Sequence, residues 1–209
     1  MRLILGGALL LATTGAAVEP VKPAAWLAFE RVWAGVAAYS TTSTFFEQKD
    51  TKVQTTVLDY TFRKPSSATV HIVKGANAGV TIVWGGGSTV VAHRGSGLAA
   101  LFKKSYSLHD KLMTTIRGSS IDQLSFAAIL AHAQDSPGTI SQATGPEING
   151  IPTEAVTLIP RSSVADTGLT REIVIISALT NIPLRVLGYT GTTLVRQLDF
   201  ANMKLELIP

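Results

Sequence analysis

Apolar and polar residues alternate along the middle of the chain, from Thr55 to Arg94. Short runs in which every second residue is large and apolar are separated by turn formers such as Gly85-Gly86-Gly87-Ser88. This pattern predicts antiparallel β-strands joined by short turns, with one solvated face and one apolar face. The large residues predicted on the apolar face are Leu58, Tyr60, Phe62, Val70, Ile72, Val80, Ile82 and Trp84.

A helical pattern comes before these strands. Apolar residues at intervals of three and four form one stripe between Ala24 and Thr41: Trp26, Phe29, Trp33, Val36 and Ala37. The spacing predicts a helix over Ala24–Thr41 that docks its stripe on the sheet, because an isolated helix of this length gains little stability. The first strand is then expected over Thr42–Lys49.

A second helix is predicted over Ser119–Gln134. Ser120 and Gln123 have the spacing of a capping box. The body of this helix, Phe126–Ala133, is apolar almost all round, which is typical of a helix buried on several sides. We therefore expect this segment to lie across the mouth of the sheet.

Strand patterns return in the C-terminal part of the chain. Asn149-Gly150, a strong hairpin signal, separates two of them. The predicted strands are Thr139–Glu147, Pro152–Ile159, Thr170–Ser177, Pro183–Tyr189, Thr192–Leu198 and Met203–Ile208. The total of ten or eleven strands exceeds what a flat open sheet holds without curling, so the expected fold is α+β with a curled antiparallel sheet.

Composition supports one folded domain with a sizeable core: 46% of the 209 residues are hydrophobic and 15% are charged. The net charge of +4 is mild and scattered, so no nucleic-acid partner is expected. There is no cysteine, which excludes a disulfide framework and a lipid carried on an N-terminal cysteine.

The first residues have the pattern of a secretory signal. A basic start at Met1-Arg2 is followed by the apolar run Leu3–Ala12 and by the small residues Gly15-Ala16-Ala17. The run is shorter than the roughly 20 residues of a membrane span, which favours cleavage after Ala17 over an uncleaved anchor. We expect a signal peptide over residues 1–17 and a single exported domain over residues 18–209.

Motifs for catalysis, metals or cofactors do not stand out. The sequence has no H-E-x-x-H, no G-x-S-x-G, and no ligand-spaced pair among its four histidines. Gly95–Ala100 matches the dinucleotide fingerprint literally, but it follows antiparallel strands and does not open a βαβ unit, so we interpret it as a turn. No catalytic residue, metal or cofactor is expected. A hydrolase with an unmarked site, such as a Ser-His-acid cluster or a metal between His71 and His93, stays open because such sites are recognised by geometry.

An apolar sheet face can be filled by the protein's own packing or left as a cavity for an apolar guest. The residues alone leave both alternatives open.

Several motifs bear on this choice. The strand Thr44–Lys49, followed by the basic turn Phe62-Arg63-Lys64-Pro65, resembles the start of the LolA/LolB-like superfamily of periplasmic lipid and lipoprotein carriers. Further segments resemble an uncharacterised family of bacterial secreted proteins within that superfamily: Asn149–Pro152, Thr180–Arg185 and Asp199–Leu205.

The resemblance implies an incomplete β-barrel closed by helices that act as a lid over a cavity for acyl chains. It also implies that a basic residue of the turn contacts the lid, here Lys64 with Arg63 beside it. Because the sequence has no cysteine, this chain resembles the soluble carrier more than the membrane-anchored receptor. The segment Ser120–Gln134 suits the lid.

The expected function is thus a non-enzymatic periplasmic carrier, a monomer, that binds acyl chains of a lipid or lipoprotein and meets a membrane protein transiently. The eight apolar strand residues named above would form the cavity wall, and Leu124, Ile129 and Leu130 the lid. The alternative is a structural or interaction module of the cell envelope with a fully packed core.

Overall fold

The structure is a computed structural model that describes residues 21–95, 97, 101–135, 138–161 and 168–209. The predicted signal peptide lies outside the described residues, as do Ser96 and Leu98–Ala100 of the glycine-rich turn. Within the described residues, no helix has the length and apolar character needed to cross a membrane.

One antiparallel sheet of eleven strands dominates the fold, in the order β6-β5-β4-β3-β2-β1-β11-β10-β9-β8-β7. The strands are β1 (Val36–Lys49), β2 (Lys52–Arg63), β3 (Ser67–Lys74), β4 (Val80–Trp84), β5 (Thr89–Arg94), β6 (Lys104–Ser107), β7 (Thr139–Thr144), β8 (Thr153–Ile159), β9 (Arg171–Ser177), β10 (Pro183–Thr190) and β11 (Thr193–Leu207). The pairing of β1 with β11 joins two meanders into one sheet.

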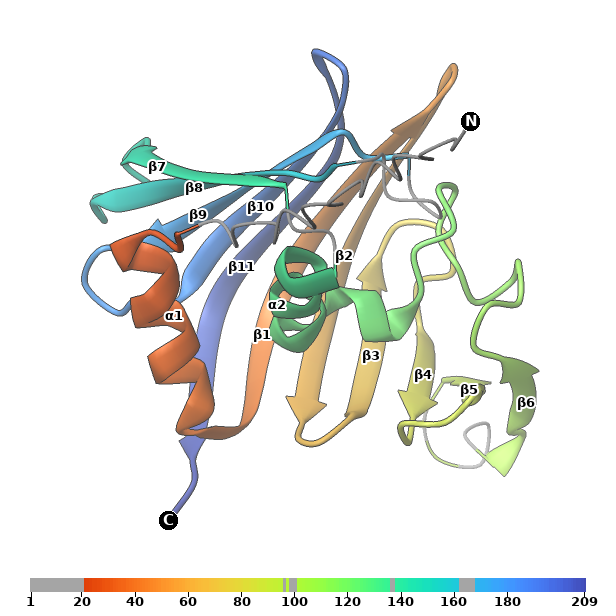
Figure 1. The fold of residues 1–209 in the computed structure, drawn as a ribbon. Coiled ribbons are helices and arrows are strands. Elements are labelled where there is room, and N and C mark those ends of the chain that lie inside the picture. The colour runs from red at the N-terminus through yellow and green to blue at the C-terminus, as the bar shows by residue number, and fades with distance from the viewer. Residues whose placement is uncertain (1–20, 96, 98–100, 136–137, 162–167) are drawn as a thin grey trace, which may run out of the picture.

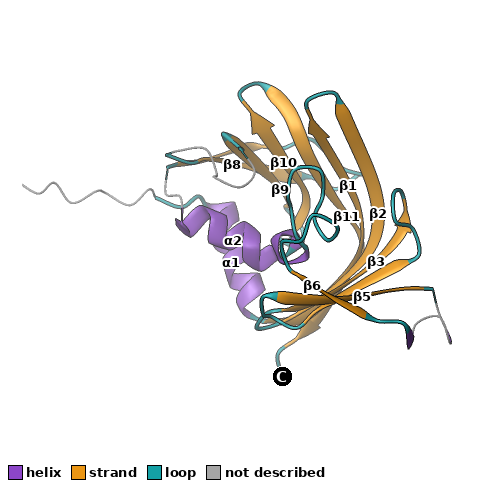
Figure 2. Cartoon of the chain, turned by 90° about the vertical axis from the view of Figure 1, so that its right-hand side faces the viewer, coloured by secondary structure: helices purple, strands orange, loops and turns teal. Residues whose placement is uncertain are grey.

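The sheet is strongly curled, and both helices lie on its concave side (Figures 1 and 2). Because β6 and β7 end the strand order without pairing to each other, the sheet stays unclosed. The predicted α+β fold, an incomplete barrel with an N-terminal and a later helix, is confirmed.

Helix α1 covers Ala24–Ala34 and is shorter than predicted. The expectation that it runs to Thr41 was wrong: Gly35 caps it, and Val36 already begins β1. The run of serine and threonine from Ser40 to Thr44 has weak helix propensity. It gains more by pairing with β2 on one side and β11 on the other.

The predicted helix over Ser119–Gln134 is two pieces, the 3-10 helix η2 (Ile121–Leu124) and helix α2 (Phe126–Asp135). Ser125 separates them in an extended conformation. Its hydroxyl oxygen accepts a hydrogen bond of 3.1 Å from the Ala128 amide and so starts a new helix. The capping box predicted at Ser120 is confirmed, at the start of η2.

The strands differ from prediction at two further places. The two C-terminal strands are one, β11, whose register shift against β1 lies beside the left-handed residue Asn202. Strand β6 was not predicted, because four residues are too few to show alternation. At Asn149-Gly150 both residues have positive φ, as the predicted hairpin turn requires.

An aromatic cluster fixes α2 to the sheet. The ring of Phe126, which is fully buried, stacks on Tyr39 of β1 with centroids 4.4 Å apart. The Phe126 amide donates a 3.3 Å hydrogen bond to the Tyr39 hydroxyl. Further edge contacts join Phe126 to Phe29 and Trp33 of α1 and to Phe200 of β11. Burial raises the pKa of Tyr39 well above its ordinary value, so the phenol stays neutral.

Truncating the centre of this cluster should be costly. We expect Phe126→Ala to lower the free energy of unfolding by about 3–5 kcal/mol, since it leaves a cavity among rings that cannot close around it. Urea denaturation measures this loss. Phe102→Ala is the matched control, because Phe102 is 84% exposed, and it should change stability little. Equal losses for the two variants would contradict the role assigned to Phe126.

Candidate ligand-binding cavity

A cavity of about 410 Å³ lies on the concave face beside the aromatic cluster. Its floor comes from strands β1 to β6, and its roof from the segment between Leu112 and Leu124. The cavity therefore occupies the part of the curled sheet that α1 and α2 leave uncovered.

The sequence-predicted wall divides into two groups. Six of its residues line the cavity: Leu58, Val70, Ile72, Val80, Ile82 and Leu124. Five others are buried in the core outside the cavity lining: Tyr60, Phe62, Trp84, Ile129 and Leu130. Alternation along the strands predicted the shared face, but it does not show which part of that face the helices cover.

The roof is the main feature that sequence analysis missed. It begins in the loop before η2, where Leu112, Met113 and Thr115 line the cavity. Only Ser120, Ile121 and Leu124 of the predicted lid segment do so. This loop has no periodic pattern, so no local signal pointed to it.

A buried carboxylate holds the roof to the sheet. Glu47 of β1 is 1% exposed. One of its oxygens accepts a 2.8 Å hydrogen bond from the Ser119 hydroxyl, and the other accepts a 3.1 Å bond from the Arg117 amide. The Arg117 guanidinium also donates to the Gln48 carbonyl at 2.9 Å. These bonds satisfy a group that would be costly to bury alone, so the roof and Glu47 stabilise each other.

A hydrogen bond from β2 also holds the start of η2. The Tyr60 hydroxyl donates a 3.3 Å hydrogen bond to the Ile121 carbonyl. Burial raises the pKa of Tyr60 well above its ordinary value, with nearby Tyr39 and Asp122 adding to the effect. The phenol thus remains a donor, and Tyr60 supports the roof from outside the cavity.

A polar contact joins the last turn of helix α2 to the sheet. His132 Nδ1 lies 3.3 Å from Glu172 Oε2 of β9, and Glu172 is 5% exposed. Burial alone would raise the pKa of Glu172, but the hydrogen bond and charge of His132, with the charge of Arg196, hold it below its ordinary value. The carboxylate is therefore the stable form in the folded protein.

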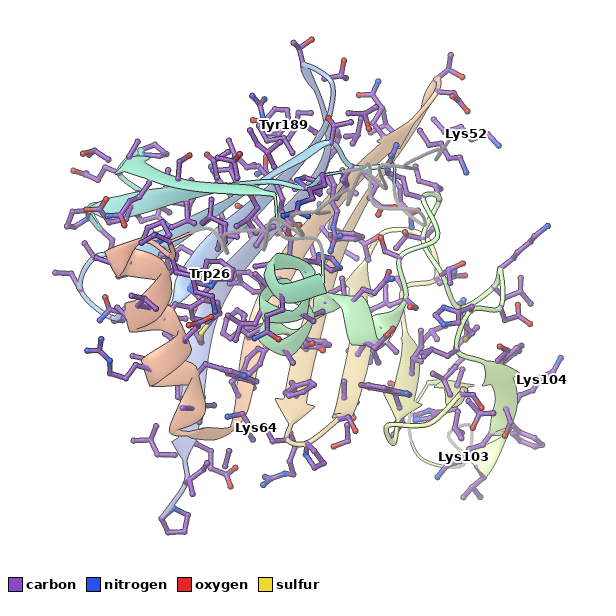
Figure 3. The ribbon with its side chains drawn as sticks, viewed as in Figure 1. Trp26, Lys52, Lys64, Lys103, Lys104 and Tyr189 are labelled. Atoms are coloured by element: carbon purple, nitrogen blue, oxygen red, sulfur yellow. The ribbon has the colours of Figure 1, made fainter. Side chains whose placement is uncertain are left out.

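The basic turn contacts α1. Lys64 Nζ lies 4.2 Å from the centroid of the Trp33 ring and donates to the carbonyls of Trp33 and Ala34 at the end of α1. Figure 3 shows Lys64 beside this helix end. Arg63 instead pairs with Glu206 of β11 at 2.8 Å. The contacts of Lys64 thus lie at the end of α1, and the expected contact of these two residues with Ser120–Gln134 stays a prediction.

Histidine chemistry has little geometric support. His71 Nδ1 lies 3.0 Å from the Thr81 hydroxyl, and Thr81 faces His93 in register. The backbones of His71 and His93 are therefore two strand spacings apart, roughly 10 Å. The described residues contain no cluster of three or more metal-ligating groups, and none of their serine hydroxyls hydrogen-bonds to a histidine.

Comparison with known proteins supports the fold. No family model and no curated protein match the sequence. The Mycobacterium tuberculosis lipoprotein LppX is similar in structure over 86% of this chain and 93% of that chain, with 15% identity and a TM-score of 0.51. MucB is similar over 88% of this chain, with 13% identity and a TM-score of 0.51, and the chain spans 60% of the MucB chain.

A LolA superfamily protein from Nitrosomonas europaea also matches, over 92% of this chain and 96% of that chain, at 12% identity and a TM-score of 0.39. The likeness to LppX and MucB is one of fold, and a LolA superfamily protein is among the structures that match. Identities this low say nothing about ligand or partner.

Removing the carboxylate that holds the roof should loosen it. We expect Glu47→Ala to lower the free energy of unfolding by about 1–3 kcal/mol, because the Ser119 hydroxyl and the Arg117 amide lose their acceptor. Hydrogen exchange should speed up in the roof and stay unchanged in α2. Glu147→Ala, at an exposed position, is the control. Unchanged exchange in the roof of Glu47→Ala would refute this role.

The contact between His132 of α2 and Glu172 predicts that the free energy of unfolding depends on pH. The pKa of Glu172 is lowered on folding from 4.5, so its contribution to stability is present above pH 4.5. It is lost as the pH falls through the folded value. We expect Glu172→Gln to be less stable than wild type at neutral pH and to lose less stability on acidification. Unfolding curves over this range test it, with Glu147→Gln as the control; an unchanged acid slope in Glu172→Gln would count against this contact.

Proposed function

We propose that the protein is a non-enzymatic carrier that holds an acyl chain of a lipid or lipoprotein in this cavity. The observation that carries the proposal is the 410 Å³ of unfilled space above an apolar strand floor. Ligand sites in proteins commonly have volumes of roughly 300–1,000 Å³. The cavity falls within that range, and its floor is built from residues such as Val70 and Ile82.

The energetics suit a carrier. Each methylene transferred from water to an apolar site contributes about 0.8 kcal/mol, so one long chain amounts to on the order of 10 kcal/mol. A bilayer offers nearly the same gain. A carrier therefore needs a site about as apolar as lipid, and the strand floor supports such an exchange.

The predicted signal peptide supports action outside the cytoplasm, in the periplasm. There the carrier would collect its cargo from a membrane, with a membrane protein as a transient partner. It would act as a monomer, since one chain supplies both floor and roof.

The alternative, an envelope module with a fully packed core, finds support in one half of the molecule. The rings of the aromatic cluster around Phe126 are buried, and none of them is among the described residues that line the cavity. The two functions differ in the other half, where only a carrier requires an accessible cavity.

Filling the cavity separates these functions. We expect wild-type protein to bind an apolar fluorescent probe, and Ala92→Trp to weaken binding about tenfold or more, because the indole occupies the space that the probe needs. Ala92 is a buried lining residue. Val83→Trp is the matched control, because Val83 of the neighbouring strand is 42% exposed and lies outside the lining.

A second readout does not depend on the probe. Native mass spectrometry of protein purified from its host should show bound mass that organic solvent extracts as lipid, and Ala92→Trp should carry less of it. Absence of both bound mass and probe binding in folded wild-type protein would favour the envelope module.

A further inference from the structure

Two basic side chains, Arg94 and Lys104, lie among the residues that line the cavity. Among the described lining residues, none is aspartate or glutamate. The polar part of the lining otherwise consists of neutral or titratable groups such as Gln54, Thr56 and His93. The charged groups of the site are therefore cations alone.

Strand register brings these two cations together. Ala92 faces Lys104 across the β5–β6 pair, and Val80 faces Arg94 across the β4–β5 pair. Arg94 follows Ala92 by two residues and so shares its face. It is a diagonal neighbour of Lys104, and such neighbours stand about 7–8 Å apart, within reach of long side chains. Figure 3 shows Lys104 at β6, the edge of the sheet.

Neither cation has an acidic partner among the described residues. Three other basic side chains of the described residues do: Lys22 pairs with Glu30, Arg63 with Glu206 and Arg185 with Asp199. Lys104 Nζ lies 5.0 Å from the centroid of the Tyr106 ring, a contact that supplies no opposite charge. Exposed cations are commonly just solvated. These two differ because they share a face with an apolar floor and border its cavity.

We propose that the cavity takes an anionic amphiphile, whose carboxylate or phosphate group is held by Arg94 and Lys104 at the β5–β6 edge. The hydrocarbon chain would lie inward over the apolar floor. Guanidinium and ammonium groups form charge-assisted hydrogen bonds with both anions, and arginine does so in a bidentate manner. This inference rests on the proposed carrier function and specifies the class of its cargo.

The experiment compares ligands that share a chain and differ in the headgroup. Dodecanoate, dodecyl phosphate and neutral dodecanol compete for the bound fluorescent probe at low salt. We expect the two anions to bind with an affinity at least about fivefold higher than that of the alcohol, because two partly solvated ion contacts would add this much. High salt should shrink this preference. The relative affinity of the two anions distinguishes a fatty-acid from a phospholipid source.

The double variant Arg94→Gln/Lys104→Gln should lose the preference for anions, because its affinities for dodecanoate and dodecyl phosphate fall toward its affinity for dodecanol. The matched control is Arg31→Gln/Lys52→Gln, which also removes one arginine and one lysine, both exposed and outside the lining. It should keep the preference.

The outcomes separate this inference from the carrier function. If wild-type protein binds all three amphiphiles equally, or if the double variant keeps the anion preference, the headgroup site is refuted while the carrier function stands. If folded wild-type protein binds neither the probe nor any amphiphile, the carrier function itself fails.

Discussion

The packing of Phe126 on Tyr39 is the contact on which the architecture depends. It fixes α2 to the centre of the concave face, and α1 joins it through Phe29 and Trp33. A curled sheet of eleven strands has more apolar surface than two short helices can cover. Filling one half therefore leaves the other half hollow, and the cavity results from that division.

The hollow half has a different kind of cover. Helix α2 is held by buried rings, whereas the roof is held by hydrogen bonds to Glu47, by the bond from Tyr60 to Ile121 and by the buried side chains of Ile121 and Leu124. Displacing α2 would expose Phe126 to water, at a large cost in buried apolar surface. Displacing the start of the roof would expose little that is not already exposed, since Leu112 is 66% accessible.

Charge follows the same division. Around the packed half, some basic groups are matched by acids or helix carbonyls, as Lys64 is at the end of α1 and Arg63 at Glu206. At the β5–β6 edge of the hollow half, Arg94 and Lys104 lie beside an apolar floor, and the lining residues that the structure describes include no acid. An apolar site bordered by unmatched cations is complementary to a hydrocarbon chain that ends in an anion.

The sequence by itself determined most of the strands, their shared apolar face and the curl, because alternation and strand number are local or additive properties. It also showed the Asn149-Gly150 turn and the capping box at Ser120. Only the tertiary structure decided that Val36–Thr41 is strand, since pairing on both sides outweighs a helical pattern. It likewise decided that Leu58 and Ile82 face a cavity while Tyr60 and Phe62 face rings. The physical reason is that the position of a residue along its own strand sets the face of the sheet on which its side chain lies. The atoms that this side chain contacts come from segments distant in sequence.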